Sequence, residues 1–338
     1  MSKYSSLALM FCCFAWAPAC TDEASPDGGM TGPGWVSATT TTDDGKIVIE
    51  KVKYRSGGLL VVGQVCRPAG DGPFPLIVSN HGGFAGLPAW NGGACEEAAR
   101  AGYVQIEPAF RGQDGSEGFV EMCSGEVDDA LRMLEIALQM PEVDPARVAM
   151  WGTSHGGCVT ARALLSGAPV KVAASVFGIT SMGAAYQFWQ SQLTAGVGPI
   201  AQYQRLIDLA NAGIGGSPDE YPEEYQSRSP IEYATQLPAG VPFLIAHGAA
   251  DPLVPPRQSC ELAKRLNVQG HHFDQDHQIL TTIPKGCEST WTASGSPIGS
   301  WQGERYLLVY DGLASTPTNE PTSAMDTDVD AFLRAKLR

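Results

Sequence analysis

Hydrophobic and polar positions alternate along this chain with two different periods. Residues 46–53 and 59–66 alternate every second position, as half-buried strands do, and a Gly57-Gly58 turn separates them. Residues 75–80 (PLIVSN) form a continuous apolar run, which is expected of a strand buried on both faces of a parallel sheet. This part of the chain predicts a hairpin that leads into a buried sheet.

Helical and strand patterns then follow one another. We expect helices over 95–101, 127–140, 157–165, 256–266 and 326–337. We expect strands over 103–107, 147–151, 170–177, 241–246 and 305–310. Repeated strand and helix units with short links favour a doubly wound, mostly parallel α/β sheet.

Two segments depart from this alternation. Residues 183–229 are rich in aromatic residues and helical in pattern, at a place where such folds insert a cap over the site. Residues 267–300 are irregular and longer than a simple loop needs to be. The sequence therefore predicts one domain over 46–338, with a helical cap at about 183–229 and an insertion at about 267–300.

The first residues have the features of an export signal. Lys3 supplies a positive charge, residues 7–16 are apolar, and small residues precede Cys20. A cysteine at this place is typical of a bacterial lipoprotein signal, in which Cys20 carries the lipid; ordinary secretion is the alternative. We interpret 1–20 as the signal and 21–45 as a flexible tether, and expect a lipid-anchored or secreted protein outside the cytoplasm.

Charge and cysteine content narrow the function classes. The net charge of -14 argues against nucleic acid as a partner, and 43% hydrophobic residues favour a globular fold. No closely spaced cysteine pair has matching histidines, so we expect no metal and no cofactor. An oxidising compartment permits up to three disulfides, whose pairing stays open, among Cys66, Cys95, Cys123, Cys158, Cys260 and Cys287.

The candidate nucleophile is Ser154, in the stretch VAMWGTSHGG at 148–157. A GxSxG motif is weak evidence alone, but here it follows a predicted strand and opens a predicted helix, as a nucleophile elbow requires. The alternative is a serine that only forms the turn. The helix N-terminus also favours the negative charge that develops during acyl transfer.

Two further segments complete the predicted site. The glycine-rich loop NHGGF at 80–84 leaves the buried strand 75–80, and we expect the backbone N–H groups of Gly83 and His155 to form the oxyanion hole, unless the glycines only make a turn. In LIAHGAADPLVPPRQS (244–259), Asp251 follows a strand and comes in the chain order Ser, Asp typical of α/β-hydrolases. Its alternative role is in a turn or helix cap.

Together these stretches resemble the α/β-hydrolase superfamily and, within it, the catalytic domain of the prolyl oligopeptidase family and esterase relatives such as dienelactone hydrolases. The similar stretches also include GYVQIEPAFRGQDGSEGF (102–119), GEVDDALRML (125–134) and RSPIEYA (228–234). The resemblance implies structural, buried polar roles for Arg111 and Asp128. No β-propeller precedes the domain, so we expect a stand-alone esterase rather than an oligopeptidase.

The histidine that should activate Ser154 is missing from its family position. The family places it after the last strand in a segment like VYPGxxHG, whereas this chain reads VYDGLAST at 309–316, and no histidine follows His277. By elimination, His272 or His277 of the insertion is the candidate base. The insertion begins and ends at the amino edge of the predicted sheet, opposite the site.

Two hypotheses follow. One is a serine hydrolase that acts on small esters or short peptides, with a displaced histidine as base. The other is a degenerate hydrolase that binds a ligand with the old pocket, because loss of a triad member costs several orders of magnitude in rate. Aromatic residues are candidates either for an acyl pocket or for core packing: Phe84, Trp90, Tyr186, Phe188 and Trp189.

Overall fold

A computed structural model describes residues 34–43, 45–87, 93–274, 276–288, 297–312 and 324–338. Its strands form one sheet, in the spatial order β1-β2-β3-β5-β4-β6-β7-β8-β11-β9-β10. The first six strands are β1 (Trp35–Asp43), β2 (Ile47–Ser56), β3 (Leu59–Pro68), β4 (Phe74–Asn80), β5 (Val104–Pro108) and β6 (Val143–Thr153). The others are β7 (Val172–Val176), β8 (Phe243–Gly248), β9 (Gly270–Phe273), β10 (Ile279–Leu280) and β11 (Arg305–Tyr310).

The centre of the sheet is parallel. From β5 through β4, β6, β7, β8 and β11 to β9, each strand pairs in parallel with its neighbour, whereas β1, β2, β3 and β10 pair antiparallel. Parallel strands end at the same edge, so the segments that follow β4, β6, β7, β8 and β11 start from one side of the sheet. Sites in such folds form at this carboxyl edge.

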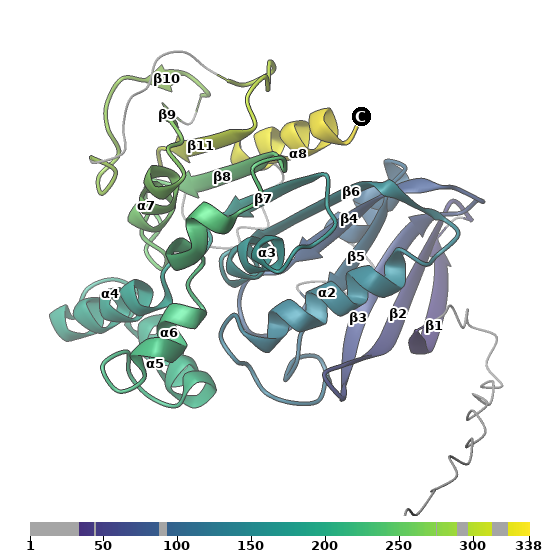
Figure 1. Cartoon of the computed structure of the whole chain (residues 1–338), viewed down its shortest axis with the longest axis horizontal. Helices are drawn as coiled ribbons and strands as arrows, with labels where there is room; N and C mark the ends of the chain where they lie inside the picture. The colour runs from purple at the N-terminus through teal and green to yellow at the C-terminus, as the bar shows by residue number, and fades with distance from the viewer. Residues whose placement is uncertain (1–33, 44, 88–92, 275, 289–296, 313–323) are drawn as a thin grey trace, which may run out of the picture.

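Helices cover both faces of the sheet (Figure 1). They are α1 (Ala94–Arg100), α2 (Gly125–Ala137), α3 (His155–Leu165), α4 (Met182–Ala195), α5 (Ile200–Ile214), α6 (Pro222–Ser227), α7 (Arg257–Arg265) and α8 (Ala324–Leu337), with a 3₁₀ helix η1 (Pro230–Gln236). Residues of α2, α3 and α7 share one buried core layer, and α8 packs in a second layer on the other face. The fold is therefore the doubly wound, mostly parallel α/β sheet that the sequence predicts.

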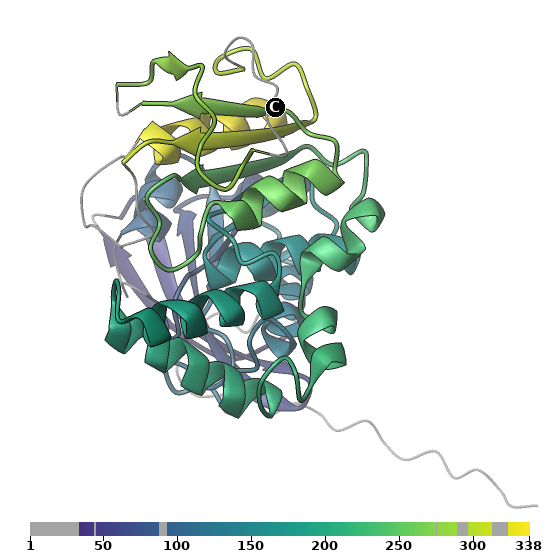
Figure 2. The same ribbon diagram turned by 90° about the vertical axis from the view of Figure 1, so that its left-hand side faces the viewer.

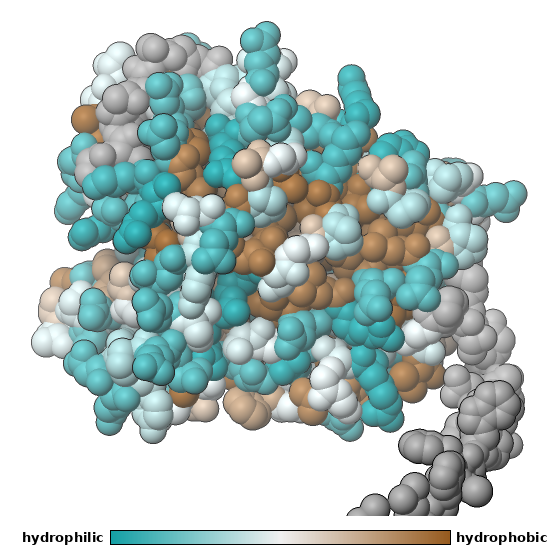
Figure 3. Space-filling model, viewed as in Figure 1, coloured by the Kyte–Doolittle hydropathy of each residue, from teal (hydrophilic) through white to brown (hydrophobic). Residues whose placement is uncertain are grey.

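The face that carries α2 and α3 is apolar in its middle. Figure 3 shows hydrophobic residues at the surface where these two helices lie in Figure 1. Leu131 of α2 and Leu165 of α3 are only partly buried and pack against the main core. Among the described residues, no helix is both long and apolar enough to cross a membrane.

Strand β1 corrects the predicted tether. Residues 35–43, which we placed in a tether at 21–45, form a strand that pairs with β2 along most of its length. The threonine run at 39–42 gives no alternation of apolar and polar positions, which explains why the pattern did not reveal a strand. The predicted signal at 1–20, including Cys20, lies outside the described residues.

The cap consists of α4, α5 and α6, between residues 182 and 227, close to the range that the sequence predicts. Helix α4 begins at Ser181, whose side chain accepts a hydrogen bond from the Ala184 N–H at 3.3 Å, and ends at Gly196 in the left-handed region (φ 67). Figure 2, turned by 90° from Figure 1, shows helices α4 and α5 side by side across the face of the molecule that is turned toward the viewer.

The six cysteines pair as three disulfides, which settles what the sequence left open. Cys66 bonds to Cys95, Cys123 to Cys158 and Cys260 to Cys287. The pairs tie α1 to β3, the start of α2 to α3, and α7 to the insertion. Each closes a loop of about 30 residues, which removes conformational entropy from the unfolded chain.

A carboxyl group is buried on β5. The side chain of Glu107 accepts hydrogen bonds from the Gln105 Nε2 at 2.7 Å and the Gln64 Nε2 at 3.3 Å. Burial raises the pKa of Glu107 from 4.5 to about 7, although these two amides and the Ser79 side chain lower it. The folded protein therefore holds a proton on Glu107 at pH values where the unfolded chain has released it.

We expect Glu107→Gln to make the protein less sensitive to pH. The raised pKa gives the wild type stability that is fully present below pH 4.5 and is lost as pH rises to about 7. Glutamine cannot ionise, so the variant's free energy of unfolding, minus that of the wild type, should be larger by about 3 kcal/mol at pH 8 than at pH 4. Urea unfolding at both pH values measures this difference, in which pH-independent effects cancel. A difference that does not change with pH would contradict the expectation.

Candidate active site

Ser154 occupies a sharp turn between β6 and α3. Its φ of 52° and ψ of -115° lie in a region that residues with a side chain rarely adopt. Backbone hydrogen bonds join the turn to β7 and to the segment after it, because the Ser154 N–H donates to the Val176 carbonyl at 2.9 Å and the Ile179 N–H donates to the Ser154 carbonyl at 3.3 Å. A strained residue held in this way is typical of functional sites.

The glycines of the motif are required by close packing around this turn. A Cβ on Gly152 would lie 2.8 Å from the Asn80 Cβ, and one on Gly156 would overlap the Asn80 carbonyl. A Cβ on Gly157 would lie 2.8 Å from the Gly178 Cα. The strand β4, the turn and helix α3 therefore approach each other at distances that only glycine permits.

The loop after β4 lies against the nucleophile turn. A Cβ on Gly82 would lie 2.9 Å from the Thr153 Oγ1 and 3.3 Å from the Ser154 Cβ. Gly83 has a φ of 73° and open space beside it, and it is exposed. This loop therefore lies next to Ser154, and the role of the Gly83 N–H as an oxyanion donor stays a prediction.

The rings of His155 and His81 are both buried beside the turn. The Nε2 of His155 accepts a hydrogen bond from the Cys123 N–H at 3.1 Å, and the ring packs on Phe84 with centroids 4.8 Å apart. Burial, together with the nearby His81, lowers the pKa of His155 to about 3, and burial lowers the pKa of His81. These contacts give both side chains roles in packing around the turn and leave the backbone N–H of His155 as the group that our site prediction uses.

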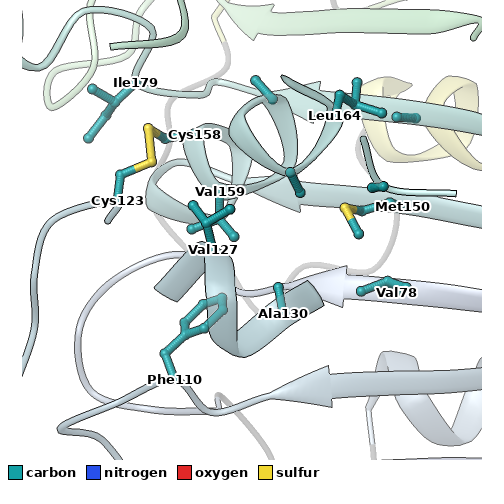
Figure 4. Packing of buried hydrophobic residues seen from close by; sticks show 14 of the residues in the cluster. Val78, Phe110, Cys123, Val127, Ala130, Met150, Cys158, Val159, Leu164 and Ile179 are labelled. Carbon is teal, nitrogen blue, oxygen red and sulfur yellow. A yellow bond between two sulfur atoms is a disulfide. The ribbon is translucent and has the colours of Figure 1, made fainter. Parts of the chain in front are cut away.

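The disulfide between Cys123 and Cys158 fixes the first turns of α3. Figure 4 shows it beside Ile179 and close to Val159 and Val127, within the buried core. The backbone N–H of Cys123 also donates the hydrogen bond that the Nε2 of His155 accepts. Helix α3 is therefore held covalently four residues after Ser154.

Asp251 follows β8 at the carboxyl edge and is buried. Its Oδ1 accepts hydrogen bonds from the Leu253 N–H at 2.8 Å and the Val254 N–H at 2.9 Å. Its Oδ2 lies 3.6 Å from the Nε2 of His247, a ring that is held by Ser259 and by the Val254 carbonyl. Since β8 is the second neighbour of β6, the strands that lead to Ser154 and Asp251 are about 10 Å apart.

The insertion adds strands to the edge of the sheet. It begins and ends at the amino edge, as expected, but β9 runs parallel to β11 and carries its histidines towards the carboxyl edge. There the Nε2 of His272 lies 2.8 Å from the Asp311 Oδ1, and the Nε2 of His277 lies 3.2 Å from the Asp328 Oδ2. Both imidazoles are thus engaged with carboxylates other than Asp251.

These contacts do not bring an imidazole to the nucleophile. Strand β9 is the fourth neighbour of β6, which corresponds to about 19 Å between the two strands. In the described part of the chain, no side chain makes a hydrogen bond to the Ser154 hydroxyl. Residues 313–323, which include Ser315 at the family position of the base, lie outside the described residues.

The aromatic residues proposed for an acyl pocket divide into two groups. Tyr186 and Trp189 are buried in the cap and belong to the core. Phe188 lines a cleft of about 570 Å³ between α4, α7 and η1, whereas Phe84 packs on His155. Trp90 lies outside the described residues. The cleft does not include Ser154, so it is not a pocket around the nucleophile.

The structure corrects one residue and adds two. Arg111 pairs with Asp129, at 2.8 Å between Nη2 and Oδ1, while Asp128 is exposed on α2. The sequence motif holds two adjacent aspartates, and only the orientation of α2 decides which one faces Arg111. Trp189 and Tyr203 of the cap contact the segment after Asp251, and no sequence signal pointed to those contacts.

Comparison with known proteins gives these features a family. A model of the prolyl oligopeptidase family matches residues 96–279, more than half of the chain. The chain belongs to the prolyl oligopeptidase family. The match includes both Ser154 and Asp251, and the resemblance noted in the sequence is confirmed.

Relatives of this prolyl oligopeptidase family member include two peptidases of Bacillus subtilis. The chain is 28% identical over 214 residues to the uncharacterized peptidase YtmA, covering 63% of this chain and 77% of YtmA. It is 25% identical over 244 residues to the uncharacterized peptidase YuxL, covering 65% of this chain but only 33% of YuxL. The chain thus spans most of the first relative and about a third of the second.

Two solved structures share the fold. The acylaminoacyl peptidase of Pyrococcus horikoshii matches with a TM-score of 0.62 at 20% identity, over 86% of this chain and 42% of that protein. Acetyl xylan esterase 1 of a Thermoanaerobacterium species matches with a TM-score of 0.58 at 14% identity, over 89% of this chain and 87% of the esterase. The α/β-hydrolase fold is therefore shared with a peptidase and with an esterase.

Proposed function

We propose that this protein is an extracytoplasmic serine hydrolase that acts on carboxylic esters or short peptides through an acyl-enzyme on Ser154. The observation that carries the proposal is the conformation of Ser154, a residue with φ 52° at the junction of β6 and α3 and beside the Gly82-Gly83 loop. Backbone strain of this kind clusters at functional sites, which supports a catalytic role for Ser154.

The chemistry has two steps. The Ser154 Oγ attacks the substrate carbonyl carbon and gives up its proton, so that a tetrahedral oxyanion forms. Its collapse breaks the bond between the carbonyl carbon and the leaving group, which departs as an alcohol or amine that carries a proton, and leaves an ester on Ser154. Water then attacks that ester and releases the acid. In our proposal the backbone N–H groups of Gly83 and His155 stabilise the oxyanion, where such a donor contributes about 10²–10³ in rate.

The substrate class in this proposal follows from the relatives. Family members in the comparisons are named as peptidases, and one structural neighbour is named as an acetyl xylan esterase. Acyl transfer from an ester and from an amide uses the same nucleophile and oxyanion hole. The cap contacts the segment after Asp251, at the carboxyl edge of the sheet where Ser154 also lies, and this position supports small substrates.

The extracytoplasmic location rests on the signal-like residues 1–20 and on the disulfides. Three cysteine pairs at bonding distance support an oxidising compartment. Lipidation of Cys20 or simple secretion both fit the sequence. Mass spectrometry of the mature N-terminus distinguishes the two.

A second candidate function is binding without catalysis. It is favoured by the contacts of His272 and His277, which hold both rings on Asp311 and Asp328. A serine without a base is a weak nucleophile at neutral pH. In that case the elbow remains as architecture and the protein binds a ligand near it.

The test compares wild type with Ser154→Ala in the hydrolysis of p-nitrophenyl acetate and butyrate and in labelling by a fluorophosphonate. We expect Ser154→Ala to lower turnover by about 10³-fold or more and to abolish labelling, because the nucleophile is lost. Ser227→Ala, at a partly exposed serine on α6, is the matched control and should behave as wild type.

Two further variants address the base. His272→Ala and His277→Ala are assayed beside Ser154→Ala under the same conditions. A loss of similar size in one of them identifies a displaced histidine as the base, while full activity in both excludes these two residues. Wild type that neither turns over nor labels would contradict the proposed hydrolase and favour the binding protein.

A further inference from the structure

We infer that helices α4 and α5 of the cap help to set the catalytic geometry: Trp189 and Tyr203 are positioning residues that hold the Asp251 turn in place. This inference rests on the proposed function, because it assigns Asp251 to the reaction. It goes beyond that function in giving the α4–α5 pair a role in setting the geometry of the site.

Two hydrogen bonds join the cap to the segment directly after Asp251. The Trp189 Nε1–H of α4 donates to the Leu253 carbonyl at 2.8 Å. The Tyr203 hydroxyl of α5 donates to the Pro252 carbonyl at 2.6 Å. Two helices of the cap are therefore hydrogen-bonded to two successive peptide groups of one turn.

Backbone groups of the same turn also bind the Asp251 carboxylate. The Leu253 and Val254 N–H groups both donate to the Asp251 Oδ1. Leu253 is thus fixed on both sides, with its N–H bonded to Asp251 and its carbonyl bonded to Trp189. Movement of the cap would shift this peptide and with it the direction of the carboxylate.

Burial makes these bonds strong determinants of geometry. Trp189 and Tyr203 are almost fully buried, so a broken bond would leave a polar atom without water to replace the partner. Burial and, after it, the charge of Asp251 raise the pKa of the Tyr203 hydroxyl.

The local sequence is built to allow this contact. A Cβ on Gly198 would lie 2.7 Å from the Tyr203 hydroxyl oxygen, so only glycine leaves the hydroxyl its path to Pro252. The rings of Phe188 and Tyr203 pack edge to face at 6.0 Å, and the Tyr186 hydroxyl bonds to Asn211 at 3.1 Å. These contacts join α4 and α5 into one unit that bears on the turn.

The cap offers a matched control. The Tyr225 hydroxyl also donates to a backbone carbonyl, that of Gly216 at 2.9 Å, and its ring is equally buried. That bond, however, stays within the cap and does not reach the Asp251 turn. Tyr203→Phe and Tyr225→Phe therefore remove the same group from the same kind of bond and keep the ring.

The experiment measures kcat and KM for p-nitrophenyl butyrate, the rate of fluorophosphonate labelling, and hydrogen–deuterium exchange of the peptide over 249–256. For Tyr203→Phe we expect kcat and the labelling rate to fall by about tenfold with KM nearly unchanged, because a small displacement of a catalytic group lowers the rate steeply. Exchange at Leu253 and Val254 should become faster, because their bonds to Asp251 loosen. Tyr225→Phe should leave all four quantities as in wild type.

Each other result is decisive. If Tyr203→Phe matches Tyr225→Phe in kinetics, the positioning role is overturned, even if both variants melt at a lower temperature. If wild type shows neither turnover nor labelling, the proposed function fails. Hydrogen–deuterium exchange alone then decides whether Tyr203 holds the Asp251 turn. Faster exchange in Tyr203→Phe only would support a cap that holds the Asp251 turn, and unchanged exchange would refute it.

Discussion

Replacing Gly156 by alanine is expected to destabilise the protein by about 4 kcal/mol or more, a large share of the roughly 5–15 kcal/mol that usually stabilises a folded domain. The new Cβ would overlap the Asn80 carbonyl and lie 2.6 Å from the His81 carbonyl oxygen. Both obstacles are backbone atoms at the end of β4, so neither can swing aside as a side chain does. The helix propensity of alanine offsets only about 1 kcal/mol of this cost.

Urea unfolding and soluble yield measure this effect. Gly240→Ala is the control, because a Cβ there meets no atom within 4 Å and the residue is exposed. We expect it to change the free energy of unfolding by less than about 0.5 kcal/mol. A stable Gly156→Ala protein would show that β4 and α3 are farther apart than the structure places them.

Removal of the Asp129 carboxylate should have the second largest effect, a loss of about 3–5 kcal/mol. Asp129 accepts hydrogen bonds from the Arg111 Nε at 3.0 Å, its Nη2 at 2.8 Å and its backbone N–H at 2.9 Å. The guanidinium is buried, so Asp129→Ala leaves a charged group with one remaining carboxylate, that of Glu121 at 2.6 Å. The cost is mainly that of an undercompensated buried charge.

The neighbouring residue provides the control for this prediction. Asp128→Ala changes an exposed aspartate on the same turn of α2, and we expect a change within about 0.5 kcal/mol. Thermal unfolding of both variants at pH 7 gives the comparison. Equal stability of the two variants would mean that the Arg111 pair contributes little to folding.

The order of elements was predictable because it is written in local periodicity. The strand 305–310 has the predicted bounds, and β4, β5 and α3 begin or end within a few residues of their predicted positions. Such segments have a clear apolar pattern and are bounded by glycine or polar turns. Strand β1 lacked that pattern, since its pairing with β2 rather than its own side chains makes it a strand.

The same distinction between local pattern and distant contacts applies to the candidate site. The sequence located the Ser154 turn and the Gly82-Gly83 loop because close backbone approach requires glycine at fixed spacing, and spacing is visible in a sequence. It did not distinguish Asp128 from Asp129, which differ only in the direction in which α2 presents them. The cap contacts of Trp189 and Tyr203 join residues about 50 to 60 positions apart from their partners, which local pattern does not encode.

By itself, then, the sequence determined the doubly wound fold, the nucleophile motif and the absence of a histidine at its family position, because each of these depends on residue type and short-range spacing. The tertiary structure decided which cysteines pair, where the insertion's histidines lie, and which side chains hold Asp251. Those outcomes depend on the order of strands and the packing of helices. They are set by contacts between segments that are far apart in the sequence, and these contacts form only when the chain folds.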